Sequence, residues 1–133
     1  MSCWGTGELK QYDVGDPFHP RESGSVQLGG ITRRRAHPAA PDRPLAGGPQ
    51  MVEVSRDGHR VYVTNSLYGV WDDIFYPDGV GAWMAKLDAD QDGGGLTVNT
   101  GFFPNGDDFR GLRVHQTRLQ GGDASSDSYC FTR

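Results

Sequence analysis

His115 is the residue whose side chain and surroundings best suit metal binding. It lies a few residues ahead of the glycine pair Gly121-Gly122 and the polar run Asp123–Asp127. A neutral imidazole is a common protein ligand for copper, zinc or iron. Asp123 and Asp127 could orient that imidazole by accepting its ring N–H. A single histidine is more often only a hydrogen-bonded polar residue, so the residues alone leave both interpretations open.

The remaining histidines predict no second ligand beside it. His19 lies between prolines in a turn, His37 stands in a long Pro-rich stretch, and His59 follows an Asp-Gly turn. No two histidines share a ligand-pair spacing such as H-x-H or H-x-x-x-H. We therefore expect these three side chains to be exposed.

An oxygen-rich pattern runs from Asp88 to Gly93. It places acidic residues at the first, third and fifth positions and glycine at the sixth, as in a calcium loop. The twelfth position is Asn99, which cannot supply the bidentate carboxylate of an EF-hand. The pattern favours a hairpin turn, because Asp and Gly accept unusual backbone angles. Weak calcium binding is the alternative interpretation.

Four aromatic residues close together in the sequence could line an apolar pocket or pack as core, and core packing is the favoured interpretation. They are Trp71, Phe75, Tyr76 and Trp83. The two cysteines, Cys3 and Cys130, stand at opposite ends of the chain without a C-x-x-C pair, which favours two reduced thiols. Neither has a neighbouring base that would mark a catalytic thiol.

The composition narrows the classes of partner. The 133 residues carry a net charge of -4 and a pI near 5.4, which argues against nucleic acid or an anionic membrane as the main partner. The basic triplet Arg33-Arg34-Arg35 lies in the Pro-rich stretch and is expected to be solvated. No apolar run approaches the ~20 residues of a membrane helix, and no signal segment opens the chain. The compartment cannot be assigned from these residues.

The elements that must position these residues are short strands. With 20 Gly and 8 Pro and no helical hydrophobic period, the sequence predicts an all-β fold of antiparallel strands spaced as in β-propeller blades. The strongest hairpin signal is Asp57-Gly58 between two β-branched runs. We expect strands over 8–13, 23–28, 51–55, 60–65, 80–88 and 96–103. They divide one partial domain (1–133) into a partial blade (1–30), a loop that is either functional or disordered (31–49), a blade (50–104) and a closing segment (105–133).

Several long motifs together resemble the selenium-binding protein / methanethiol oxidase family, and their details look closest to its bacterial members. They are Ser2–Gly7, Gly48–Met51, Tyr62–Tyr68, Trp71–Pro77 and Gly121–Asp127. The chain opens as if it were already inside a strand and looks like only the C-terminal portion of such a protein. The resemblance implies a seven-bladed propeller, of which this chain would supply about one and a half to two blades.

The resemblance also implies an activity: oxidation of methanethiol by dioxygen to formaldehyde, hydrogen sulfide and hydrogen peroxide. It implies a copper ion held by histidines near the propeller axis, of which only His115 falls in this chain. The other histidines and the selenium-associated cysteine would lie upstream. We therefore expect a fragment that is inactive alone and that self-associates or joins a partner chain supplying the missing blades. The alternatives are a non-enzymatic selenium- or thiol-binding or scaffold piece, and a decayed reading frame.

Overall fold

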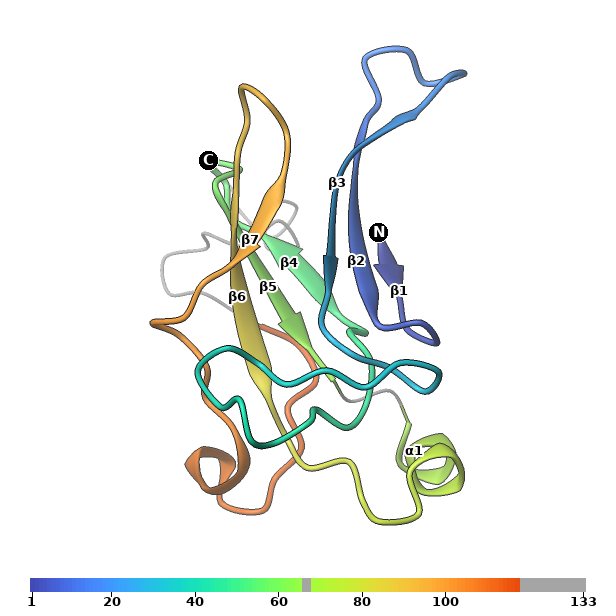
Figure 1. Cartoon of the computed structure of the whole chain (residues 1–133), viewed down its shortest axis with the longest axis vertical. Coiled ribbons are helices and arrows are strands. Elements are labelled where there is room, and N and C mark those ends of the chain that lie inside the picture. The colour runs from blue at the N-terminus through green and yellow to red at the C-terminus, as the bar shows by residue number, and fades with distance from the viewer. Residues whose placement is uncertain (66–67, 118–133) are drawn as a thin grey trace, which may run out of the picture.

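The computed structural model describes residues 1–65 and 68–117, in two antiparallel sheets and one short helix (Figure 1). The first sheet has the order β1-β2-β3 and the second has the order β4-β5-β6-β7. The all-β, antiparallel prediction is confirmed. The elements are β1 (Ser2–Cys3), β2 (Glu8–Asp13), β3 (Arg21–Gln27), β4 (Val52–Val54), β5 (Arg60–Thr64), α1 (Gly69–Phe75), β6 (Met84–Ala89), β7 (Leu96–Val98) and the 3-10 turn η1 (Gly106–Phe109).

The second sheet is a four-stranded meander with one apolar and one polar face. Its register pairs Val63 with Ala85, and Leu87 with both Val61 and Val98. Because side chains alternate across a strand, these residues share one face, while Glu53, Thr64 and their neighbours point to the other. A meander of this kind is the architecture of one propeller blade.

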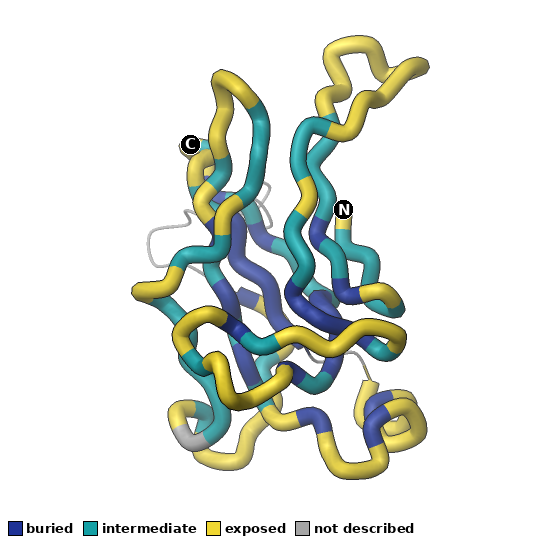
Figure 2. Tube along the Cα trace, viewed as in Figure 1, coloured by how far each residue is buried: buried dark blue, intermediate teal, exposed yellow. Residues whose placement is uncertain are grey.

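The core lies where the apolar face meets the first sheet. Leu9 and Leu28 pack there against the buried β5 and β6 residues. Figure 2 shows buried residues concentrated along β5 and β6. The first sheet also contacts the turn before β7, because Gln11 Oε1 of β2 accepts a hydrogen bond from the Gly95 N–H at 2.7 Å. A Cβ at Gly24 would lie 2.7 Å from Gly95 Cα, so this approach requires glycine.

The Asp-Gly hairpin joins β4 to β5 as the sequence predicts. Gly58 has φ of 75°, a left-handed conformation that glycine adopts without strain. Asp57 Oδ1 accepts hydrogen bonds from the Ser55 hydroxyl at 2.5 Å and the His59 N–H at 3.0 Å. These bonds, with a further contribution from Arg60, lower the pKa of Asp57 to about 2.

The stretch 31–49 contains no named strand but packs against the core. An isolated bridge joins Ala36 to Pro44, and Leu45 is buried in the core cluster. This stretch is therefore a connection without a helix or named strand of its own. The three arginines at 33–35 are exposed, as expected, although the Arg34 guanidinium carbon lies 6.0 Å from the Tyr76 ring centre.

Helix α1 departs from the prediction that no segment is helical. Seven residues are too few to show a hydrophobic period, and Tyr68 at its N-cap makes no side-chain cap hydrogen bond. Asp72 in the first turn favours the helix through its dipole. Tyr76, which precedes a proline, takes an extended φ of -134° and ends it. Within the described residues, no helix has the length and apolar composition needed to cross a lipid bilayer.

Candidate metal-ligand site

The segment 113–117, called the strap below, crosses the polar face of the second sheet and carries His115. The Thr64 hydroxyl donates a hydrogen bond to the His115 carbonyl oxygen at 2.5 Å. Gln116 Nε2 donates to Glu53 Oε1 at 3.3 Å, and the buried Thr117 places its hydroxyl 3.9 Å from the Met84 sulfur. The sheet therefore holds the chain at His115 and at the two residues that follow it.

The other end of the strap is tied to α1. Arg113 forms an ion pair with Asp72, which is fully buried, and its second nitrogen lies 3.2 Å from the exposed Asp73 carboxylate. Removing one partner of an ion pair leaves the buried charge uncompensated, so this contact matters to the position of the strap. Sequence reasoning missed Thr64, Asp72 and Arg113, because no local signal links residues 41 or 51 positions apart.

The His115 imidazole is exposed on this strap. No group of three His, Cys, Asp or Glu side chains that could hold a metal ion occurs among the described residues. Residues Asp123 and Asp127, predicted to orient the imidazole, lie outside the described part of the chain, as does Cys130. Among the described residues, His115 would therefore contribute one imidazole nitrogen to a copper centre.

His37 corrects one prediction. The sequence predicts an exposed side chain, but His37 is 1% exposed and stacks on Phe103 with ring centres 3.9 Å apart. The Ala39 N–H donates to His37 Nδ1 at 3.1 Å, so the proton of the neutral ring lies on Nε2. Burial lowers the pKa of this histidine. It is a packed core residue, and the prediction was wrong because stacking on a residue 66 positions away leaves no trace in the local sequence.

The other two histidines are exposed, as predicted. His19 lies in the β2–β3 turn, where its Nδ1 is 2.8 Å from Asp16 Oδ2. His59 lies at the β4–β5 turn. Neither is near the strap in the sequence or shares a described ligand cluster with His115.

The acidic run 88–93 covers the end of β6 and the start of the turn to β7. Asp90 Oδ1 accepts hydrogen bonds from the backbone N–H groups of Asp92 at 3.0 Å and Gly93 at 3.4 Å. Asp88 accepts one from the Asn99 amide at 2.7 Å. The carboxylates thus stabilise a hairpin turn, and this arrangement supports the turn interpretation over calcium binding.

The four aromatic residues separate into two pairs. Trp83 and Tyr76 are buried, and Trp83 Nε1 donates to the Ala46 carbonyl at 2.8 Å. Trp71 and Phe75, on α1, are exposed. The core interpretation is therefore confirmed for two residues and wrong for the other two.

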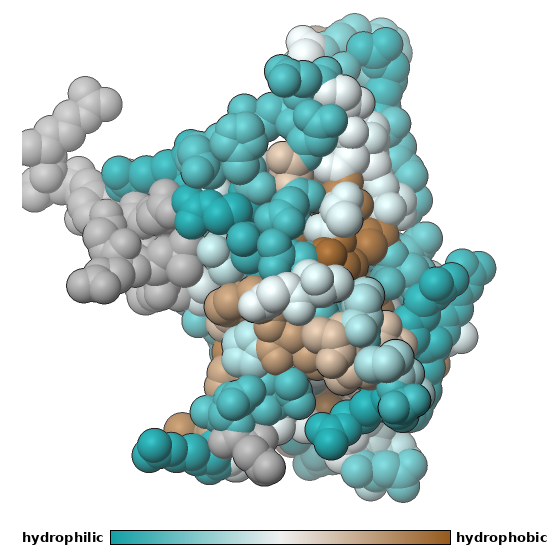
Figure 3. All heavy atoms as spheres, turned by 60° about the vertical axis from the view of Figure 1, so that its left-hand side comes forward, coloured by the Kyte–Doolittle hydropathy of each residue, from teal (hydrophilic) through white to brown (hydrophobic). Residues whose placement is uncertain are grey.

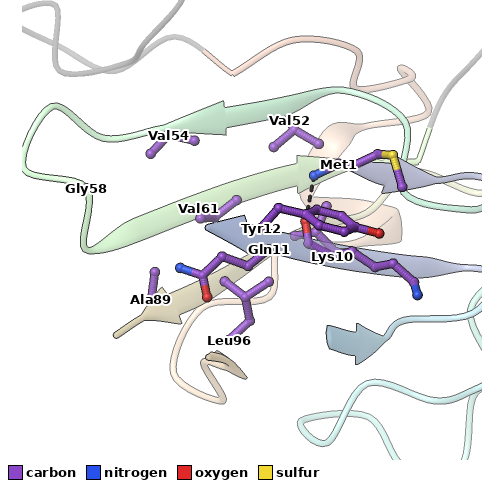
Figure 4. Close-up of a pocket in the computed structure, with 11 residues that line it drawn as sticks. Met1, Lys10, Gln11, Tyr12, Val52, Val54, Gly58, Val61, Ala89 and Leu96 are labelled. Carbon is purple, nitrogen blue, oxygen red and sulfur yellow. Dashed lines mark hydrogen bonds between the residues drawn. The ribbon is translucent and has the colours of Figure 1, made fainter. Parts of the chain in front are cut away.

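An apolar groove of about 310 Å³ opens between the two sheets (Figure 4). Val52 and Val54 of β4 and Val61 of β5 line one wall, while Gln11 and Tyr12 of β2 line the other. None of the four aromatic residues above lines it. Figure 3 shows a face where hydrophobic residues lie mainly in the middle, between hydrophilic residues above and below.

The sequence profile of the 56 kDa selenium-binding protein family matches residues 1–130. The chain belongs to this family. A hypothetical selenium-binding protein from Sulfolobus tokodaii has a solved structure that aligns with a TM-score of 0.85 and 54% identity, over 98% of this chain and 28% of that chain. The resemblance read from the sequence motifs is confirmed.

Curated family members give the same result. Methanethiol oxidase of Homo sapiens is 39% identical over 96% of this chain and 31% of its own length. Selenium-binding protein 3 of Arabidopsis thaliana is 37% identical over 95% of this chain and 30% of its own length. This selenium-binding family chain therefore spans just under a third of the length of the relatives it matches.

Proposed function

We propose that this chain contributes one part of a copper-dependent methanethiol oxidase. The observation that carries the proposal is family membership over nearly the whole chain, with relatives named methanethiol oxidase at 39–41% identity. The balanced reaction consumes methanethiol, dioxygen and water, and releases formaldehyde, hydrogen sulfide and hydrogen peroxide. When bound, copper would supply the redox chemistry with dioxygen.

His115 is the residue of this chain proposed to hold the copper ion. Its side chain is exposed, and the Thr64 hydrogen bond to its carbonyl limits movement of its backbone. One imidazole binds copper weakly and shapes no substrate pocket. The remaining ligands are proposed to come from polypeptide outside these 133 residues, so no reaction step is assigned to this chain alone.

The test is the substitution His115→Ala in a complete protein, in which this chain is present together with the polypeptide that supplies the remaining length of the family. We expect copper content, measured by mass spectrometry of the metal, and thiol-dependent peroxide release to fall together. His59→Ala is the matched control, because His59 is also exposed but lies on a turn, and it should change neither quantity. Full copper retention by His115→Ala would remove this residue from the ligand set.

A second candidate function is non-enzymatic selenium or thiol binding, or a scaffold role that completes a propeller with a partner chain. Relatives named selenium-binding protein, at 36–37% identity, favour it. The assembly would be incubated with selenite and then dialysed to remove unbound selenium. Retained selenium without peroxide release from methanethiol would support this function over the oxidase.

A further inference from the structure

Helix α1 buries a charged residue and exposes apolar residues, which is the reverse of the usual arrangement. Its buried side chain is Asp72, whereas Val70 is 72%, Trp71 52% and Ile74 67% exposed. A surface helix of a globular domain normally turns its apolar residues inward and its charges outward. Figure 2 shows this helix as mostly exposed, with burial confined to a small part of it. The exposed side of α1 is therefore unlike a surface adapted to water.

The two charged residues of α1 form ion pairs with the strap and do not cover the exposed apolar side chains of the helix. Asp72 and Asp73 both pair with Arg113 of the strap. In the same segment, five exposed apolar or aromatic side chains lie within eight residues, and two of these, Tyr68 and Trp71, meet edge to face with ring centres 5.9 Å apart. This surface, called the α1 apolar face, consists of Tyr68, Val70, Trp71, Ile74 and Phe75. Clustered aromatic residues of this kind are typical of binding surfaces.

The α1 apolar face continues into an edge of the first sheet. Trp4, which follows β1, packs edge to face on Phe75 with ring centres 5.3 Å apart. β1 is the end strand of its sheet and pairs only with β2 among the described strands. Figure 1 shows β1 and α1 on the same side of the molecule. An unpaired strand edge beside an apolar helix offers both backbone hydrogen bonds and apolar contacts to an incoming chain.

The length of related proteins indicates what covers this surface. The same local fold, aligned over 98% of this chain, makes up only 28% of the Sulfolobus tokodaii protein. That relative thus contains further polypeptide beyond the part that matches this unit. We propose that the α1 apolar face and the adjoining β1 edge dock the family polypeptide that supplies the remaining length. This inference rests on the proposed function and names the surface through which the partner joins.

The chemistry of the surface defines the partner. It must present apolar side chains to Trp71 and Ile74, because the only charges on α1 are already paired with the strap. It must also offer a strand edge to β1 at Ser2, because the Cys3 carbonyl already accepts the Gly7 N–H. A lipid surface is disfavoured, because the chain carries a net charge of -4 and no basic residue lies within α1.

The test is co-expression of this chain with a tagged form of the part of the Sulfolobus tokodaii relative that it does not match. We expect the two to co-purify as a one-to-one complex, measured by size-exclusion chromatography with light scattering. The double substitution Trp71→Asp, Ile74→Asp should reduce recovery about tenfold or more, because it places carboxylates in an apolar interface. The control is Phe18→Asp, which alters an 88% exposed side chain at the β2–β3 turn and should leave recovery unchanged.

A second measurement avoids dependence on the isolated partner. The same pair of substitutions at the aligned helix of the intact relative should lower its melting temperature by several degrees, whereas the turn control should not. An unchanged melting temperature would overturn the proposal. So would self-association of this chain alone through α1, or flotation with anionic vesicles that the double substitution abolishes. Both readouts are independent of peroxide release, so complex formation without turnover would contradict only the oxidase proposal.

Discussion

The sheet interface and helix α1 treat apolar residues in opposite ways. Where the two sheets meet, Val63, Ala85 and Leu87 are fully buried and polar groups are excluded to the other face. On α1, a carboxylate is buried and Trp71 and Ile74 face solvent. Burial of apolar side chains within this chain therefore accounts for the first region, whereas in the second only Phe75 has a described aromatic partner outside the α1 apolar face, Trp4, and Trp71 and Ile74 remain exposed.

The largest expected change in the free energy of unfolding comes from comparing one substitution in each region. Leu87→Ala leaves a cavity in the packed sheet interface and should lower the free energy of unfolding by about 2–4 kcal/mol. Ile74→Ala removes a similar side chain from the exposed helix and should change it by less than about 0.5 kcal/mol. Urea denaturation followed by circular dichroism measures both. Similar losses for the two variants would show that α1 packs inward and would remove the contrast.

A second prediction concerns the buried carboxylate of α1. Asp72→Asn weakens the ion pair with Arg113 and should lower the free energy of unfolding by about 1–3 kcal/mol. It should also speed hydrogen exchange at the strap amides, because the strap loses its attachment to α1. Asp73→Asn is the matched control: its carboxylate is exposed, so its contribution should stay below about 0.5 kcal/mol. Equal effects would mean that burial of Asp72 does not matter.

A third prediction concerns His37, a polar side chain that is buried beside the core. Burial lowers the pKa of His37, so the folded protein binds fewer protons there than the unfolded chain. Stability should therefore fall as pH drops below about 6.5, where an unfolded histidine becomes protonated. His37→Gln should remove this slope between pH 7.5 and 5, as measured by thermal melts. His59→Gln is the control, since His59 is exposed, and an unchanged slope in His37→Gln would contradict the assignment.

The smallest effect is expected at the β4–β5 turn. Because the pKa of Asp57 is lowered to about 2, its ionised form stabilises the fold above the unfolded value near 3.9. That contribution should disappear as pH falls from about 4 to 2. The melting temperatures of the wild type and Asp57→Asn should therefore differ at pH 7 and converge near pH 2. A difference that persists at pH 2 would mean that the charge of Asp57 is not the cause.

The sequence predicts the local features well. Strand 8–13 is observed with the expected bounds, and the Asp57-Gly58 turn joins the expected strands, because alternation and turn chemistry are encoded within a few residues. Strand β6 begins at Met84 rather than at residue 80, since Gly79 and Gly81 take left-handed φ values of 90° and 62°.

The features that sequence reasoning missed depend on distant contacts. The burial of His37 requires Phe103, and the strap requires Thr64 and Asp72 from two other elements. Helix α1 was missed because seven residues are too few to show a helical hydrophobic period. His115 was identified through family motifs, and its copper ligation stays a prediction.

The most direct test of the proposed function is peroxide release by the isolated 133-residue chain supplied with methanethiol, dioxygen and copper. The strap carries a single imidazole, that of His115, and the described residues contain no cluster of three metal donors, so we predict turnover no greater than that of free copper at the same concentration. Turnover clearly above free copper, lost in His115→Ala, would contradict the claim that the catalytic centre needs polypeptide beyond this chain.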